Sequence, residues 1–249
     1  MRSRGPSGLA SNSPVEEGQR GETRVASQGI VRLNEELIEG FRKLSTPNIS
    51  DALDKLGICG GCKGITPVVP GTKLVGPAYT LKYVPVGTVP GTVGDFIDDV
   101  PPGDVVVIDN GGRTYCTVWG DLLTVTAVRR GIAGTVIDGV CRDVPRIRDL
   151  AYPIFTRGCF MMTGKNRVEL AAVNVPVAIS DVKVNPGDII VGDDSGVVVV
   201  PQEKAAEILK LAEQIAEAEN GIEQAVERGM TLAQARASYH YHQLQNKQQ

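Results

Sequence analysis

The sequence predicts an α/β domain in which helices and strands form layers, and three observations support this. Short apolar runs alternate with helical patterns between residues 105 and 155, as in a sheet covered by helices. Short β segments follow between residues 173 and 200, and a long amphipathic helix comes after them. No linker or repeat interrupts this pattern. We therefore expect one domain at residues 30–230, preceded by a tail at 1–29 and followed by a polar C-terminal tail at 231–249.

The first part of the domain is predicted to be helical and then to enter the sheet. Apolar residues recur at helical spacing over residues 31–44. Pro47 stands early in a second helix, where its missing N–H costs little, and Gly57 suits the end of that helix. A Gly- and Pro-rich loop at 58–71, an alternating strand at 78–84 and a short helix at 91–100 are expected next.

The centre of the domain alternates between strands and helices. Residues 105–108 are a continuous Val and Ile run, typical of a strand buried on both faces, and residues 110–112 are expected to end it. Gly131 is expected to cap a helix at 119–130, and Asp138 with Gly139 to turn a strand at 135–137. The alternation ends with a short helix at 144–150 and a strand at 153–155.

The last part is predicted to be antiparallel β structure followed by one long helix. Pro201 opens a helix at 202–228 whose Ala, Ile and Leu residues share one face, and residues 231–249 are expected to be frayed helix or disordered. Turn residues separate three short β segments, at 173–179, 188–191 and 196–200.

Composition excludes several classes of function. The net charge of −3 supplies no basic face for nucleic acid, and no apolar run reaches the length of a membrane span. Residues 1–29 lack the apolar core of a secretory signal, so we expect a disordered or vector-derived tail and a cytoplasmic protein.

Histidine and cysteine usage narrows the possible chemistry. The only two histidines, His240 and His242, lie in the polar tail, so catalysis must use carboxylates, Arg, Lys, backbone amides or a hard metal ion. Five cysteines without a secretion signal argue against a disulfide framework. Cys59 and Cys62 form a C-x-x-C that lacks a second ligand pair for zinc, so we interpret it as a turn with two incidental thiols.

Two positions could carry chemistry. Gly120 lets a ligand approach the backbone, and the free N–H groups of the helical turn after it favour a carboxylate or phosphate; the alternative is that Asp121 only caps that helix. After the strand at 135–137, Arg142 could hold an oxyanion bidentately, and Asp143 could give an oxygen to Mg²⁺. The alternative there is a surface Arg–Asp pair in which Asp143 caps the next helix.

These positions lie in a motif that resembles the RraA-like superfamily. Residues 119–143 read W-G-D-L-L-x-x-x-A-x-x-x-G-x-x-G-x-V-x-D-G-x-x-R-D. This pattern is most similar to the class II 4-hydroxy-4-methyl-2-oxoglutarate/4-carboxy-4-hydroxy-2-oxoadipate aldolases. The G-D-L-L and D-G-x-x-R-D elements are specific for the superfamily but less so for the reaction. Further matches lie at 45–57, 153–158, 173–177 and 186–201.

The resemblance implies an α-β-β-α sandwich with a long C-terminal helix, assembled as a homotrimer or homohexamer with active sites between subunits. It implies that Asp143 binds Mg²⁺ or Mn²⁺ directly and that Arg142 lies over the reacting oxygens. The backbone amides of Leu122 and Leu123, after Gly120, would bind the pyruvate carboxylate. Asp121 would hold a metal-bound water.

A neighbouring subunit is implied to complete the site. Asp51, shorter than the Glu of many aldolases, and Glu219 would bind further metal-bound waters, with Glu217 as the alternative to Glu219. Three side chains could meet the distal end of the substrate, with packing or surface exposure as the alternative: Tyr115, Trp119 and Arg157.

The implied reaction is retro-aldol cleavage of a 4-hydroxy-2-oxo acid to pyruvate, a carbon–carbon lyase activity. The same site would decarboxylate oxaloacetate, because that reaction also leaves pyruvate enolate. Two alternatives remain: a non-catalytic protein that regulates ribonuclease E by binding it, or a metal-dependent lyase for another oxo acid. Regulators of this family typically lack a complete metal site, whereas Arg142, Asp143 and Asp121 are all present here.

Overall fold

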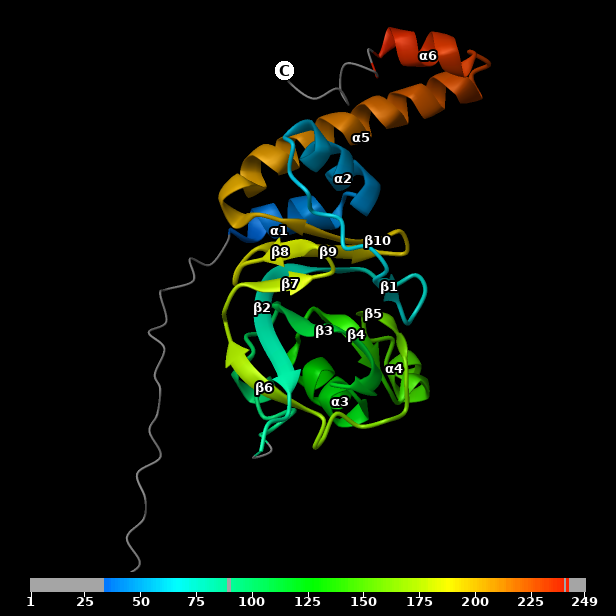
Figure 1. Ribbon diagram of the computed structural model, residues 1–249. Coiled ribbons are helices and arrows are strands. Elements are labelled where there is room, and N and C mark those ends of the chain that lie inside the picture. The colour runs from blue at the N-terminus through cyan, green and yellow to red at the C-terminus, as the bar shows by residue number, and fades with distance from the viewer. Residues whose placement is uncertain (1–33, 89–90, 240, 242–249) are drawn as a thin grey trace, which may run out of the picture. The chain divides into compact units, whose positions relative to one another are not determined.

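The computed structural model describes residues 34–88, 91–239 and 241, all of which belong to a unit spanning Val31–Gln249 (Figure 1). The expected tail at 1–29 and both histidines lie outside the described residues.

Within the described part of the chain, the main sheet has eight strands, and its centre is parallel. Strands β2, β3, β4 and β5 are parallel neighbours, while β1, β6 and β9 pair antiparallel with members of this group. Along the sheet the order is β1-β5-β4-β3-β2-β9-β10, with β6 also on β2. The strands are β1 Thr66–Pro67, β2 Leu74–Pro85, β3 Val105–Thr117, β4 Gly134–Cys141, β5 Ile154–Cys159, β6 Val168–Val173, β9 Ile189–Asp193 and β10 Gly196–Val200.

Among the described residues, a separate hairpin and five of the six α-helices pack against this sheet, while the sixth helix packs against the fifth. The hairpin, β7 with β8, is antiparallel, as β9 and β10 are, which confirms the antiparallel structure predicted for this part. The remaining elements are β7 Val177–Ile179, β8 Val182–Val184, α1 Glu35–Arg42, α2 Thr46–Lys55, α3 Asp121–Arg130, α4 Val144–Asp149, α5 Ala205–Glu227 and α6 Leu232–Ser238.

Three apolar cores separate the layers and confirm the α-β-β-α sandwich. One core lies between α3, α4 and the face of the parallel strands that carries Val106, Ile108 and Ile137. The opposite strand face, with Val107 and Val136, packs in a second core against β7, β8 and residues of β9 and β10. A third core lies between β9, β10 and helices α1, α2 and α5. In Figure 1, α1, α2 and α5 lie above β9 and β10, and α3 and α4 lie at the opposite end.

Strand β2 belongs to both strand layers. Its first residues, Leu74 to Pro77, pair with β9, and residues Ala78 to Lys82 pair with β3. The predicted strand at 78–84 is therefore the second part of a longer strand, which carries the chain from one layer into the other.

The predicted end of β3 is wrong. Residues 110–112 do not end the strand but loop out of it, so that pairing with β4 passes from Asp109 directly to Arg113. Gly111 and Gly112 allow this because they take left-handed φ angles of 59° and 69°, which cost glycine little. Residues 110–112 therefore form a bulge within β3 and not the predicted strand end.

Three other boundaries also differ from the predictions. Asp138 and Gly139 lie inside β4 and do not turn it. Of the helix predicted at 91–100, the structure has a single 3₁₀ turn at Ile97–Asp99. Helix α3 begins at Asp121, two residues after the predicted start, and ends as expected at Gly131.

The C-terminal segment contains a second helix after the predicted long one. Helix α6 begins with a capping box, in which the Thr231 hydroxyl accepts from the Gln234 N–H and the Gln234 side chain accepts from the Thr231 N–H. Ala235 is fully buried against α5 residues. Of the two alternatives for this segment, the helix is therefore found at 232–238. None of the described helices has the length and apolar character that crossing a bilayer requires.

Candidate active site

The Asp143 carboxylate is directed away from its own helix. The residue follows β4 directly and takes a left-handed φ of 58°, at the N-cap position of α4. Its side chain makes no capping hydrogen bond there; Oδ2 accepts instead from the Asp121 N–H of α3, at 3.0 Å. Asp143 therefore holds the predicted N-cap position of α4 but does not cap the helix with its side chain, and the carboxylate faces the N-terminus of α3.

Arg142 lies beside this carboxylate. Its Nε is 3.3 Å from Asp143 Oδ2, and the two side chains are 41% and 36% exposed. An ion pair as open as this contributes less than about 1 kcal/mol to stability. The fold therefore gains little from the pair, while both groups remain accessible to a ligand.

Gly120 lets α3 approach the pair closely. A Cβ at this position would lie 2.6 Å from Asp143 Oδ2 and 3.2 Å from Arg142 Nε. The backbone here is extended, with φ −147°, so the requirement for glycine comes from space and not from conformation. The two sequence motifs, G-D-L-L and R-D, thus meet at a point that admits no side chain.

Gly120 holds the N-cap position of α3, so Asp121 is the first residue of the helix and not its N-cap. Its Oδ1 accepts from the Leu122 N–H at 2.8 Å. That N–H is one of the two predicted to bind a substrate carboxylate. The predicted roles of Asp121 and Leu122 therefore require the Asp121 side chain to rotate when a substrate enters.

Thr117 joins the two halves of this site and was missed by the sequence analysis. Its buried Oγ1 lies 2.9 Å from both the Trp119 and the Val140 carbonyl oxygens, and it accepts from the Trp119 N–H at 3.2 Å. The Trp119 carbonyl also accepts from the Arg142 N–H at 3.0 Å. A threonine inside a strand gives no local sequence signal for this bridge between β3 and the end of β4.

We expect Thr117→Val to lower the free energy of unfolding by about 1–3 kcal/mol, because it leaves buried polar backbone groups without the hydroxyl. Thr117→Ser keeps the hydroxyl and loses one methyl, which costs about 0.8 kcal/mol. Urea denaturation of the two variants measures the difference. A valine variant as stable as the serine variant would show that the bridge contributes nothing.

Trp119 is not available to a substrate, so the packing alternative holds for this residue. It is almost completely buried and stacks on Tyr152, with ring centroids 6.0 Å apart and an interplanar angle of 2°. Its Nε1 donates to Thr124 Oγ1 at 2.9 Å. Tyr115 remains exposed, whereas Arg157 pairs with Asp138, and the cavity that these two residues line does not include Arg142 or Asp143.

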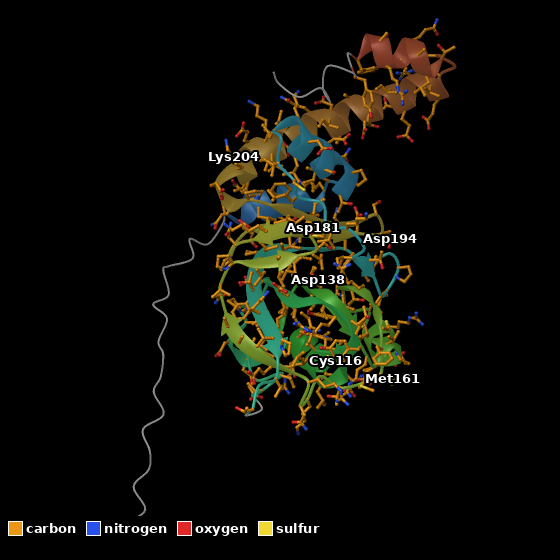
Figure 2. The ribbon with its side chains drawn as sticks, viewed as in Figure 1. Cys116, Asp138, Met161, Asp181, Asp194 and Lys204 are labelled. Carbon is orange, nitrogen blue, oxygen red and sulfur yellow. The ribbon has the colours of Figure 1, made fainter. Side chains whose placement is uncertain are left out.

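Arg157 belongs to a cavity of about 510 Å³. A row of charged residues crosses four parallel strands here, and its buried carboxylates already have partners: Asp109 pairs with Lys82 at 2.5 Å, and Asp138 with Arg157. The β7–β8 hairpin donates the Ala178 N–H to Asp109 and the Ser180 N–H to Asp138. Figure 2 labels Asp138 and Asp181, which both line the cavity. With its charges paired, this row fastens the hairpin to the sheet.

Asp51 and Glu219 lie in the outer helical layer, on α2 and α5, which pack against β9 and β10. Glu219 accepts from Asn48 Nδ2 at 2.6 Å and from the Tyr241 hydroxyl at 3.0 Å, whereas Glu217 is exposed. One chain thus places these acids in the layer opposite α3. Their predicted contribution from a neighbouring subunit stays a prediction.

The groups around Asp143 fit a hard divalent ion that needs few protein ligands. Across residues 34–88, 91–239 and 241, no group of three or more His, Cys, Asp or Glu side chains is placed to hold a metal ion. Mg²⁺ commonly takes one or two carboxylates and completes its shell with water and substrate oxygens. A half-exposed carboxylate next to the N-terminus of α3 suits that mode of binding.

Comparison with known proteins identifies the family. A family model described as "RraA-like: Aldolase/RraA" matches residues 46–199. Protein DlpA of Legionella pneumophila is 46% identical over 83% of this chain and 34% of that protein, so the chain spans about a third of its length. A "Putative 4-hydroxy-4-methyl-2-oxoglutarate aldolase" of Halalkalibacterium halodurans is 36% identical, over 71% of this chain and 82% of that protein.

A solved structure supports the same relationship. RraAS2 of Streptomyces coelicolor, described as an unusual member of the RNase ES inhibitor RraA protein family, is 34% identical. It superimposes with a TM-score of 0.68 and covers 80% of this chain and 98% of its own. The chain therefore belongs to the RraA-like family.

Proposed function

We propose that this protein is a divalent-metal-dependent lyase that cleaves a 4-hydroxy-2-oxo acid to pyruvate. One observation carries the proposal: a guanidinium and a carboxylate, Arg142 and Asp143, stand half-exposed against the N-terminus of α3, with only Gly120 between them and the helix. Carboxylate ligands, fixed positive charge and helix N-termini together bind and polarise oxo acids.

In this proposal, each residue of the site has a different role in the reaction. Cleaving the C3–C4 bond leaves negative charge on the oxygen of pyruvate enolate, and Arg142 supplies positive charge at that oxygen. The first turn of α3, at Leu122 and Leu123, binds the substrate carboxylate. Asp121 holds the water that takes the C4 hydroxyl proton. Mg²⁺ or Mn²⁺, held by Asp143, would act as a Lewis acid for the enolate charge.

The substrates we propose are 4-hydroxy-4-methyl-2-oxoglutarate and 4-carboxy-4-hydroxy-2-oxoadipate, with oxaloacetate decarboxylation as a side activity. The name of the H. halodurans relative supports the first of these. We also propose a homotrimer or homohexamer, in which a neighbouring subunit brings Asp51 and Glu219 to the site.

A pyruvate assay coupled to lactate dehydrogenase tests the function. We expect pyruvate release from a 4-hydroxy-2-oxo acid with Mg²⁺ or Mn²⁺, its loss in EDTA, and its return when the metal is added in excess. Pyruvate added directly in EDTA controls for the coupling enzyme. Absence of pyruvate with every candidate oxo acid and both metals would reject the lyase proposal.

A second candidate function is regulation of a ribonuclease by protein binding. Leu122 is 79% exposed and Met161 76% exposed, so two large apolar side chains are available for contact with a partner protein. The S. coelicolor relative comes from a ribonuclease-inhibitor family. Inhibition of ribonuclease E by this protein, together with no metal-dependent pyruvate release, would favour this candidate over the lyase.

A further inference from the structure

Two thiols face each other next to the candidate active site. Cys141 is the last residue of β4, Cys159 is the last residue of β5, and the two are directly paired in the parallel register. Their sulfur atoms lie 3.8 Å apart. Cys141 also immediately precedes Arg142, so this contact lies one residue from the proposed catalytic groups.

The backbone geometry suits a covalent bond between these sulfurs. A disulfide joins Cα atoms about 4.4–6.8 Å apart, and neighbouring strands are about 4.8 Å apart. The Cys141 carbonyl accepts from the Phe160 N–H at 2.9 Å, so the two strand ends are already held together. The sulfurs need to approach from 3.8 Å to about 2.05 Å, a movement that side-chain rotation together with a small shift of the two strand ends can supply.

The two thiols differ in accessibility, which sets the order of their reactions. Cys159 is exposed to solvent, whereas Cys141 is completely buried. A small oxidant therefore reaches Cys159 first. The buried Cys141 sulfur, 3.8 Å away, can then attack the oxidised Cys159 sulfur.

We propose that Cys159 and Cys141 are an oxidation site, at which a hydroperoxide converts the two thiols into a reversible disulfide. The Cys159 sulfur attacks a peroxide oxygen, the O–O bond breaks, and Cys159 becomes a sulfenic acid with release of water. The Cys141 sulfur then attacks the sulfenic sulfur, the S–O bond breaks, and the Cys141 proton leaves with the hydroxide as a second water. Two thiols lose two electrons, and one hydrogen peroxide becomes two waters. A dithiol such as dithiothreitol reverses the bond by exchange.

The disulfide also acts on the neighbouring groups, and this part of the inference rests on the proposed function. Closing the sulfurs draws the end of β4 toward β5 and moves the segment from which Arg142 and Asp143 project. Displacements of about 1 Å can cost a catalytic site a hundredfold in rate. We therefore expect the oxidised protein to release pyruvate at least about tenfold more slowly than the reduced protein.

Peptide mapping after peroxide treatment tests the bond without relying on enzyme activity. Trypsin places Cys141 and Cys159 in separate peptides, residues 131–142 and 158–165. After hydrogen peroxide, alkylation of the remaining thiols and digestion, we expect mass spectrometry to find these two peptides linked, and dithiothreitol to separate them. Cys159→Ser removes the linked species. Cys59→Ser, which alters an exposed thiol elsewhere, keeps it.

The possible outcomes test the oxidation site, its effect on catalysis and the proposed function separately. Peroxide treatment that leaves the peptides unlinked, or stops at oxidised Cys159 alone, overturns the oxidation site. Linked peptides with unchanged pyruvate release overturn the effect on catalysis. If the reduced protein releases no pyruvate, the proposed function fails, and the peptide map still decides whether the oxidation site exists. Cys159→Ser is expected to keep the basal activity of the reduced protein and to make it insensitive to peroxide.

Discussion

Asp143→Asn is expected to lower kcat/KM for pyruvate release by roughly a thousandfold, because it removes the negative charge that would hold the metal ion. The amide oxygen can still accept from the Asp121 N–H, so the local backbone should stay in place. The half-exposed side chain contributes little to stability, and we expect the free energy of unfolding to change by less than about 1 kcal/mol. Arg142→Ala should reduce turnover to a similar degree. The coupled pyruvate assay measures both variants.

Asp149→Asn is the matched control for this experiment. Asp149 is an exposed aspartate at the other end of α4, so its replacement removes the same charge from the same helix without touching the site. Size-exclusion chromatography should show one oligomeric state for all four proteins. Wild-type turnover in Asp143→Asn, or an equal loss in Asp149→Asn, would refute the assignment of the site.

Gly120→Ala is expected to reduce turnover by roughly a hundredfold or more, although it adds a single methyl group. That methyl would lie 2.6 Å from Asp143 Oδ2, so the carboxylate or the first turn of α3 must move. Alanine adopts the extended conformation of this residue readily, so the backbone itself is not strained. The loss should therefore come from the displaced site, and urea denaturation should show a much smaller effect on stability than on kcat.

Gly61→Ala provides the comparison for Gly120→Ala. A Cβ at Gly61 meets no atom within 4 Å, and its φ lies outside the left-handed region, so we expect wild-type turnover and stability. An active Gly120→Ala variant would mean that the contact between α3 and Asp143 does not matter for catalysis.

The fold was predictable wherever the signal is local. The Val and Ile run at 105–108 and the Ala-, Ile- and Leu-rich face of α5 each identify an element without reference to the rest of the chain. The continuation of β3 through Gly111 and Gly112 was not predictable in this way. Glycines usually end a strand, and here the pairing of Arg113 with Gly139 and of Thr117 with Val140 on β4 shows that the strand resumes. Tertiary contact thus overrides a local turn signal.

The candidate site likewise contains residues with a local sequence signal and residues whose role depends on tertiary contacts. Arg142 and Asp143 are adjacent in sequence, and Gly120 with Asp121 begins a helix, so their motif could be recognised. Thr117, which bridges β3 and the end of β4, carries no such signal. The same holds for features that depend on strand register, such as the pairing of Cys141 with Cys159 and the charged row across β2 to β5. Register is set by the packed sheet, and spacing along the chain does not reveal it.

Strand β2 pairs with β9 at its start and with β3 farther along. The layer that contains β9 and the layer that contains β3 are therefore joined by one continuous strand. Neither layer can melt or shear away from the other unless a strand that both of them use is torn loose. Heating should consequently destroy the α5 side and the Asp143 side in one cooperative step. We therefore expect the opening and closing that accompany turnover to leave the two strand layers joined and to involve side chains and the short loops beyond the strand ends.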